Sequence, residues 1–164
     1  MAILPILHYP DPRLRQRAEP VTTFDTALRQ LVDDMAETMY SAPGVGLAAP
    51  QVGVSRRLFL VDIADEDEPS DLHVFINPVI VARNGEATGP EGCLSFPGMN
   101  EDVARAKSIT VRAQRVDGSA FSLDATELLA VAIQHELDHL EGVLMIDRLG
   151  ALRKRMAMRK FSKK

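Results

Sequence analysis

The sequence predicts an α+β fold with antiparallel or mixed β-sheets packed around a central helix, and with further helices near both ends of the chain. Helical periodicity is concentrated towards the two ends, where apolar residues recur every three or four positions. The middle of the chain holds short runs rich in β-branched and aromatic residues, and two of these runs flank Asp117-Gly118, a dipeptide typical of hairpin turns. Strands in the middle and helices at the ends favour antiparallel pairing.

The first helix is expected over residues 25–40. Its apolar residues share one face at helical spacing: Leu28, Leu31, Val32, Met35 and Met39. The run Ser-Ala-Pro-Gly at residues 41–44 should end it. Residues 44–53 follow, rich in small residues and poor in charge, and their glycines would allow a ligand to approach the backbone closely.

Four strands are expected, over residues 57–63, 73–76, 108–114 and 120–123. A second helix should begin near Asp124, a plausible N-cap with Glu127 three residues later, and run to about residue 141. Gly142 should stop it. A third helix is expected over the basic residues at the end of the chain.

Size and composition predict one soluble domain over residues 1–164. Hydrophobic residues make up 46% of the chain and charged residues 26%, which is an ordinary globular balance. No apolar run approaches the length of about 20 residues that spans a bilayer, and the start of the chain lacks the features of a signal peptide. The single cysteine, Cys93, fits a reducing compartment, so a cytoplasmic location is expected.

The charge is unevenly spread. The net charge is −4, yet residues 148–164 contain eight basic side chains and no acidic ones. This basic tail suggests contact with something negative, such as nucleic acid. The alternative is a solvated helix end.

The strongest chemical signal is His-Glu-Leu-Asp-His at residues 135–139. On a helix, His135 and His139 share a face and can bind one metal ion, while Glu136 is placed to move a proton of water. The preceding residues are largely apolar, so the helix should be buried, and polar groups on a buried helix need partners. The alternative is two surface histidines that happen to lie four residues apart, but these would not need a buried helix. We therefore expect a metal-dependent hydrolase.

A catalytic site usually has three protein ligands and one open position, so a third ligand is needed. Downstream, Met145 stands where an extended protease motif would have histidine, and Asp147 is too close along the chain. Upstream, the candidates are His8, His73 and Cys93. Cys93 lies among glycine, proline and serine in residues 89–98, which does not describe a packed strand, so a thiolate ligand is favoured over a buried apolar cysteine.

These motifs resemble the peptide deformylases, which remove the formyl group from the N-terminal methionine of new polypeptides. Three separated segments carry the resemblance in the family's order: Gly-Val-Gly-Leu-Ala-Ala-Pro-Gln at residues 44–51, Glu-Gly-Cys-Leu-Ser at 91–95 and Gln-His-Glu-Leu-Asp-His at 134–139. The opening at residues 6–14 is also similar. The resemblance spans nearly the whole chain.

The resemblance implies roles for individual residues. Cys93, His135 and His139 would bind one divalent metal, usually Fe²⁺ in the family, with Zn²⁺, Ni²⁺ or Co²⁺ able to replace it. Ligand chemistry alone would have suggested zinc. Gln51 and the backbone N–H of Leu94 would hold the formyl oxygen.

The resemblance also bears on substrate contacts. Gly46 and its neighbours, together with Gly92, would line the substrate groove. Arg105 matches a basic residue that the family often carries, whereas Asn100 stands where some members have arginine, which puts contacts to later peptide residues in doubt.

Two further expectations concern the surroundings of the motif. A pocket for the methionine side chain is expected from Val45, Leu128, Val131 and Ala132, the alternative being that these residues are plain core. Asp138 should pair with a basic group or with a ligand histidine.

Two other functions remain open at this point. The same ligands could serve a peptidase that cuts internal peptide bonds. The chain could also be a binding module that docks on RNA or the ribosome through residues 148–164 and holds a structural metal. In the deformylase reading the basic tail would equally allow docking on ribosomal RNA, and formylmethionyl peptides would be the substrate.

Overall fold

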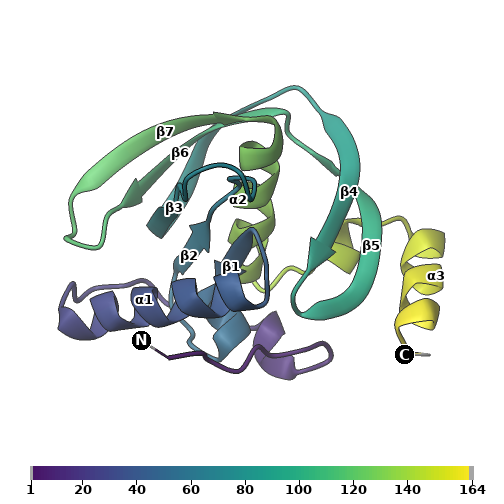
Figure 1. Cartoon of the computed structure of the whole chain (residues 1–164). Coiled ribbons are helices and arrows are strands. Elements are labelled where there is room, and N and C mark those ends of the chain that lie inside the picture. Colours follow the sequence, from purple (N-terminus) through teal and green to yellow (C-terminus); the bar gives the residue numbers. More distant parts are fainter. Residues whose placement is uncertain (1, 163–164) are drawn as a thin grey trace.

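The computed structural model describes residues 2–162, which form two β-sheets with helix α2 (Glu127–Leu140) between them (Figure 1). The larger sheet is antiparallel, in the order β1-β2-β3-β6-β7, and the smaller one is the hairpin β4-β5. Their strands are β1 (Gly46–Ala48), β2 (Leu58–Val61), β3 (His73–Asn84), β4 (Ala87–Cys93), β5 (Phe96–Arg105), β6 (Ser108–Gln114) and β7 (Ala120–Thr126). The predicted α+β class and the central helix are confirmed.

The remaining helices lie at the edges of this arrangement (Figure 1). They are α1 (Thr26–Ser41) and α3 (Ala151–Ser162), with short 3₁₀ turns η1 (Pro12–Arg15), η2 (Ala49–Val52) and η3 (Met145–Arg148). Across the described part of the chain, every helix is too short or too polar to cross a membrane.

Helix α1 forms as its pattern predicts. The Asp25 side chain accepts a hydrogen bond of 3.0 Å from the Leu28 N–H and caps the first turn. Its apolar face, including Met35 and Met39, is fully buried against Leu47 and other residues of β1 and β2. This face holds β1 and the loop before it in place.

Helix α2 is buried, as its apolar sequence predicts. Ile133 and Leu140 are fully buried in a cluster that includes Phe59 and Phe75 of the large sheet. Gly142 follows the helix with φ of 76°, a left-handed conformation that favours glycine, so its role as the stop is confirmed.

The predicted start of α2 at Asp124 is wrong. Asp124 lies within β7 and accepts a hydrogen bond from Thr110 Oγ1 on β6 at 2.6 Å, so its side chain is engaged across the sheet. The N-cap is Thr126, and the chain then turns sharply at Glu127, where φ is 53°. A strand that continues to Thr126 leaves no room for the earlier helix start.

Two strand predictions were also incomplete. Strand β3 continues beyond residue 76 to Asn84, past an irregularity at Asn77, whose φ is 52° and whose side chain bonds to Val21 and Gln114. Residues 89–98, expected not to describe a packed strand, contain the end of β4 and the beginning of β5. The β4-β5 hairpin forms a sheet of its own and so has open edges, which is where Pro90 is tolerated.

The basic tail is partly folded into the molecule. Leu149 and Ala157 are buried with Phe96 of β5, and Arg153 donates a hydrogen bond to the Asp102 carbonyl. Its last two basic residues, Lys163 and Lys164, lie outside the described residues. Helix α3 is therefore attached to the body of the molecule through Ala157 while most of its described side chains are exposed, and both alternatives for the basic residues stay predictions.

Candidate metal centre

The structure brings together the three expected ligands. His135 and His139 lie one turn apart on α2, and Cys93 reaches them from the end of β4, where the hairpin register shifts. The ligand atoms of all three lie within 4.8 Å of one another, and Cys93 Sγ is 3.4 Å from His139 Nε2. The other two upstream candidates, His8 and His73, are not part of this cluster.

The donor set fits a divalent transition metal. A tetrahedral ion with bonds of about 2.0–2.3 Å would separate its ligand atoms by roughly 3.3–3.7 Å, close to the observed sulfur–nitrogen distance. Thiolate with imidazole suits iron, zinc, nickel or cobalt better than magnesium or calcium. In addition, the buried Glu136 Oε1 has no hydrogen-bond partner in the protein, as expected of a carboxylate that faces a reacting water.

The orientation of the His135 ring is fixed by a hydrogen bond to Glu91. Its Nδ1 lies 2.9 Å from Glu91 Oε1, so Nδ1–H donates to this carboxylate and Nε2 is left to bind a metal. Glu91 is held in turn by Arg105, through two bonds of 2.9 Å. The predicted pairing of Asp138 with a basic group is also confirmed, because Asp138 pairs with both Arg105 and Arg148.

The charges of these groups favour a thiolate. Burial would raise the pKa of Cys93, but electrostatic interactions and hydrogen bonds with His139 and His135 outweigh it and hold that pKa well below its usual value. The pKa of Glu136 is raised, mainly by burial. A thiolate beside a carboxyl group of raised pKa provides a metal ligand and a proton acceptor in one site.

Glu136 is packed tightly against β1. Gly46 faces its carboxylate so closely that a Cβ at this position would collide with Glu136 Oε2 and would lie 2.9 Å from its Cδ. The glycine is therefore required by the close approach of the Glu136 side chain to the strand.

The Gln51 side chain points towards Cys93, one of the expected ligands. Its side chain is 1% exposed, and Oε1 accepts a hydrogen bond of 2.9 Å from the Ala48 N–H. This bond leaves Nε2 to point at Ser95 Oγ, 3.1 Å away, and at Cys93 Sγ, 3.7 Å away. The turn η2 thus presents an amide N–H₂ beside the metal ligands.

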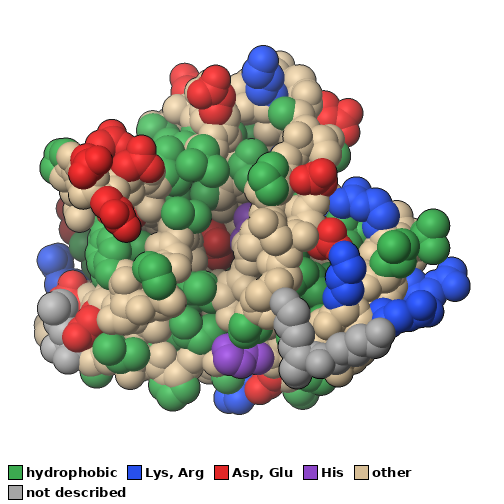
Figure 2. Space-filling model, turned by 45° about the vertical axis from the view of Figure 1, so that its right-hand side comes forward, with side chains coloured by type: hydrophobic (Ala, Val, Ile, Leu, Met, Phe, Trp, Pro, Cys, Tyr) green, Lys and Arg blue, Asp and Glu red, His purple; other side chains and the backbone are tan. Residues whose placement is uncertain are grey.

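These side chains lie in an open groove of about 650 Å³. Figure 2 shows a hollow with acidic and histidine side chains at its bottom and hydrophobic side chains around it. Its lining includes Val45, Gly46, Gly92 and Leu94, as well as Gln51, Cys93, His135 and Glu136.

Leu128 and Val131 are not among the residues that line this groove. Leu128 is in the first turn of α2 and is 54% exposed, whereas the groove reaches α2 only at His135 and Glu136. Ala132, the third helix residue expected there, is buried in the core cluster under the large sheet. The lining of this groove thus reaches α2 at His135 and Glu136, and the methionine pocket expected from Leu128, Val131 and Ala132 stays a prediction.

Sequence reasoning gave no role to several residues that shape the site. Ile6 lines the groove from the N-terminal segment, which is held by bonds from Leu7 N–H to the Gln51 carbonyl and from Tyr9 N–H to the Ser95 carbonyl. Met99 lines it from β5. Neither position carries a chemical signature, and only the similarity of residues 6–14 to the family's opening pointed to this segment.

Comparison with known proteins agrees with this geometry. A family model described as polypeptide deformylase matches residues 3–155. A peptide deformylase of Acidobacterium capsulatum is 52% identical over 99% of this chain and 96% of its own length, and one of Nitrosococcus oceani is 53% identical over 100% and 97%.

Solved structures give the same result. The crystal structure of a peptide deformylase from Legionella pneumophila has a TM-score of 0.93, with 48% identity over 99% of this chain and 95% of that chain. One from Synechococcus elongatus, in complex with actinonin, has a TM-score of 0.91 and 42% identity over 97% and 88%. The chain therefore belongs to the polypeptide deformylase family, whose members are metal-dependent hydrolases that remove the N-formyl group from nascent polypeptides.

Proposed function

We propose that residues 1–164 act as one catalytic domain in which Cys93, His135 and His139 hold a single ion at the bottom of the groove, where the formyl group of an N-formylmethionyl peptide is hydrolysed. The observation that carries this proposal is the convergence of these three ligand atoms within 4.8 Å, beside a groove lined by Cys93, His135, Gln51 and Glu136.

Glu136 is proposed as the proton carrier. When bound, a divalent ion polarises a carbonyl oxygen and lowers the pKa of water, which makes hydroxide available near neutral pH. The Glu136 carboxylate, buried and with Oε1 unpartnered, accepts the proton of the attacking water and later gives it to the leaving amine. Burial raises the pKa of Glu136, which makes its carboxylate a better acceptor for the proton of the water.

Gln51 and Leu94 are proposed to stabilise the charge that develops on the formyl oxygen. The Gln51 side chain is already fixed by the Ala48 N–H, so its N–H₂ group needs little reorganisation. The backbone N–H of Leu94, next to the ligand Cys93, would be the second donor. Removing one donor of this kind typically slows an enzyme by about 10²–10³.

The substrate's first side chain would contact the apolar part of the groove. Val45 and Gly46 lie on one side of it and Gly92 on β4 on another. Replacing Val45, which is exposed in the groove, with a charged residue should raise KM for methionine substrates. The same change at Val79 of β3, which is exposed and lies outside the groove, is the matched control and should leave KM unchanged.

A direct assay separates deformylase activity from peptidase activity. The metal-loaded protein is incubated with a formyl-Met dipeptide and, separately, with an unblocked peptide of the same sequence, and formate and new amines are measured. Formate release from the blocked peptide alone supports the proposal. Cleavage of internal bonds would favour the peptidase, and no turnover of either would favour a binding module.

We further propose Fe²⁺ as the ion in the cell, since the family usually carries it and the thiolate–imidazole set accepts it. Metal analysis of protein purified without oxygen tests this directly. Iron at about one equivalent per chain is expected, and zinc as the main metal in that preparation would contradict it.

Docking on the ribosome is proposed through the exposed face of α3. Figure 2 shows Lys and Arg side chains gathered on one side of the molecule, and Arg155 and Arg159 of α3 are exposed. Reversing both charges should weaken ribosome binding in a salt-dependent way while small-peptide turnover persists. Substitution is preferable to deletion of the tail, because Leu149 and Ala157 belong to the core. Unchanged binding would exclude α3 as the docking site. This role places the protein in the cytoplasm, where nascent chains appear.

A further inference from the structure

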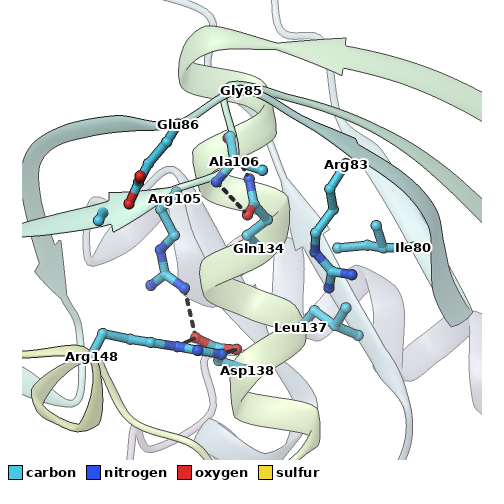
Figure 3. Close-up of a pocket in the computed structure, with 11 residues that line it drawn as sticks. Ile80, Arg83, Gly85, Glu86, Arg105, Ala106, Gln134, Leu137, Asp138 and Arg148 are labelled. Atoms are coloured by element: carbon cyan, nitrogen blue, oxygen red, sulfur yellow. Dashed lines mark hydrogen bonds and ion pairs between the residues drawn. The ribbon is translucent and has the colours of Figure 1, made fainter.

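A second cavity of about 460 Å³ is lined by Gln134, Leu137 and Asp138 of α2, none of which lines the groove of the metal centre (Figure 3). Arg105 and Arg148 extend into it from different segments and meet at Asp138 of α2 (Figure 3). Arg148 lies at the end of η3, outside the three motifs of the family resemblance and at the beginning of the basic tail. Neither the groove nor the proposed chemistry uses it.

Arg148 is the outer end of a continuous chain of ion pairs that reaches a metal ligand. Arg148 Nε and Nη2 contact the two oxygens of Asp138 at 3.0 and 2.7 Å. Asp138 Oδ2 is 2.6 Å from Arg105 Nη1, and Arg105 grips Glu91 with two bonds of 2.9 Å. Glu91 Oε1 finally accepts the Nδ1–H of His135 at 2.9 Å.

The charges of Glu91, Arg105, Asp138 and Arg148 sum to zero only when Arg148 is present. Glu91 and Arg105 have side chains that are 5% and 4% exposed, and together they are neutral. Asp138, at 12% exposure, adds a negative charge that Arg105 meets with its one remaining nitrogen. Arg148 compensates that charge with a two-bond contact, and it is the one member of the chain that reaches solvent, at 47% exposure.

Loss of Arg148 should therefore affect the orientation of the His135 ring. Asp138 would keep a nearly buried oxygen, Oδ1, without its partner, and Arg105 would be drawn towards Asp138 and away from Glu91. A weaker Glu91–Arg105 contact leaves the Glu91 carboxylate, and so the ring of His135, less firmly oriented.

We propose that Arg148 is a positioning residue for the metal site, acting on His135 through Asp138, Arg105 and Glu91. The proposal rests on the proposed role of His135 as a ligand. The competing explanation is that Arg148 merely fastens η3 to α2 and contributes to stability alone.

Binding of Co²⁺ distinguishes a positioning role of Arg148 from a role in stability alone. Co²⁺ is titrated into metal-free Arg148→Met in competition with a chelator, and the thiolate-to-cobalt absorption band is recorded with the dissociation constant. Removing a partner that contacts a ligand typically costs 10–100-fold in affinity, so removing a residue four contacts away from the ligand should cost about 3- to 10-fold. The absorption band should shift as well, because the ring of His135 is reoriented.

Arg15→Met is the matched control. Arg15 pairs with Asp147, the residue next to Arg148, and its side chain has a similar exposure of 41%. This variant loses an ion pair at the same turn without touching Asp138, so its thermal stability should fall comparably while Co²⁺ affinity and the band stay unchanged. Arg148→Lys, which keeps the charge with a less suited geometry, should lie between wild type and Arg148→Met.

Two results would overturn the proposal. One is that Arg148→Met binds Co²⁺ with the affinity and the spectrum of the wild type. If Arg148→Met fails to fold, the same result in Arg148→Lys overturns the proposal. The other is an equal loss of affinity in Arg15→Met. Failure of the ligand assignment itself would be visible separately, since His135→Ala would then retain the wild-type band.

Discussion

Substituting alanine for Gly46 should disable the proton carrier while leaving the fold intact. A Cβ at this position would lie 2.9 Å from Glu136 Cδ and 3.0 Å from Cγ, and closer still to Oε2. Ordinary contacts of a Cβ begin at 3.4 Å, so the carboxylate must move by about half an ångström or more. Glu136 lines the groove beside the metal ligands, so any such movement displaces its carboxylate from the place where the proton is transferred.

The magnitude follows from the sensitivity of catalysis to position. A displacement of about 1 Å costs on the order of 10²-fold in rate, so a shift of half that size or more should lower kcat by about 10- to 100-fold. This corresponds to about 1.4–2.7 kcal/mol of lost transition-state stabilisation. KM should change little, because the methyl group is directed at Glu136.

The assay is formate release from a formyl-Met dipeptide, with thermal unfolding and metal content measured on the same samples. Gly89→Ala is the control, since a Cβ at Gly89 of β4 meets nothing within 4 Å. Undiminished kcat in Gly46→Ala, or an equal loss in Gly89→Ala, would refute the reasoning. A rise in KM alone would mean that the methyl group obstructs the groove instead.

Three other outcomes are expected. Gly142→Ala should destabilise the protein by about 3 kcal/mol, or roughly 6–12 °C in thermal unfolding, because φ is 76° and the Cβ would collide with the Arg15 carbonyl. The control is Gly150→Ala, which has open space around it and should be nearly neutral. Equal stability of the two variants would contradict the clash. Glu136→Gln should keep its metal and lose turnover, measured by metal analysis and formate release, and retained turnover would remove Glu136 from its role. Burial and its carboxylate partner raise the pKa of Tyr40 to about 12, so the stability that its protonated phenol provides is complete below pH 10 and is lost as pH rises through 12. A tyrosinate absorbance titration should show a component near pH 12 that disappears in Tyr40→Phe, and a midpoint near 10 would disprove this.

The predictions from sequence were right where one local pattern determined the structure. The periodicity of residues 25–40 was sufficient for α1, because a single apolar face packs against one sheet. His135 and His139 were found from their spacing alone, since four residues on a helix return to the same side.

The predictions failed where distant partners determine the structure. Strand β4 contains Gly89, Pro90 and Gly92, a composition typical of turns, and it is a strand because β5 pairs with it in an isolated hairpin. Asp124 resembles an N-cap until its partner Thr110 on the neighbouring strand is known. Ile6 and Met99 of the groove were given no role for the same reason, because they come from segments far away in the sequence.

The division of the ligands between two parts of the fold has a mechanical consequence. Two imidazoles belong to the rigid central helix, whereas the sulfur belongs to a ribbon of only two strands, β4 and β5. An ion shared by both is a cross-link between them, and at 100 times its dissociation constant it would add about 2.7 kcal/mol to the free energy of unfolding. Removing it should speed amide exchange in the ribbon far more than in β6 and β7, so the groove's outer wall would be tethered by the same atom that serves the chemistry.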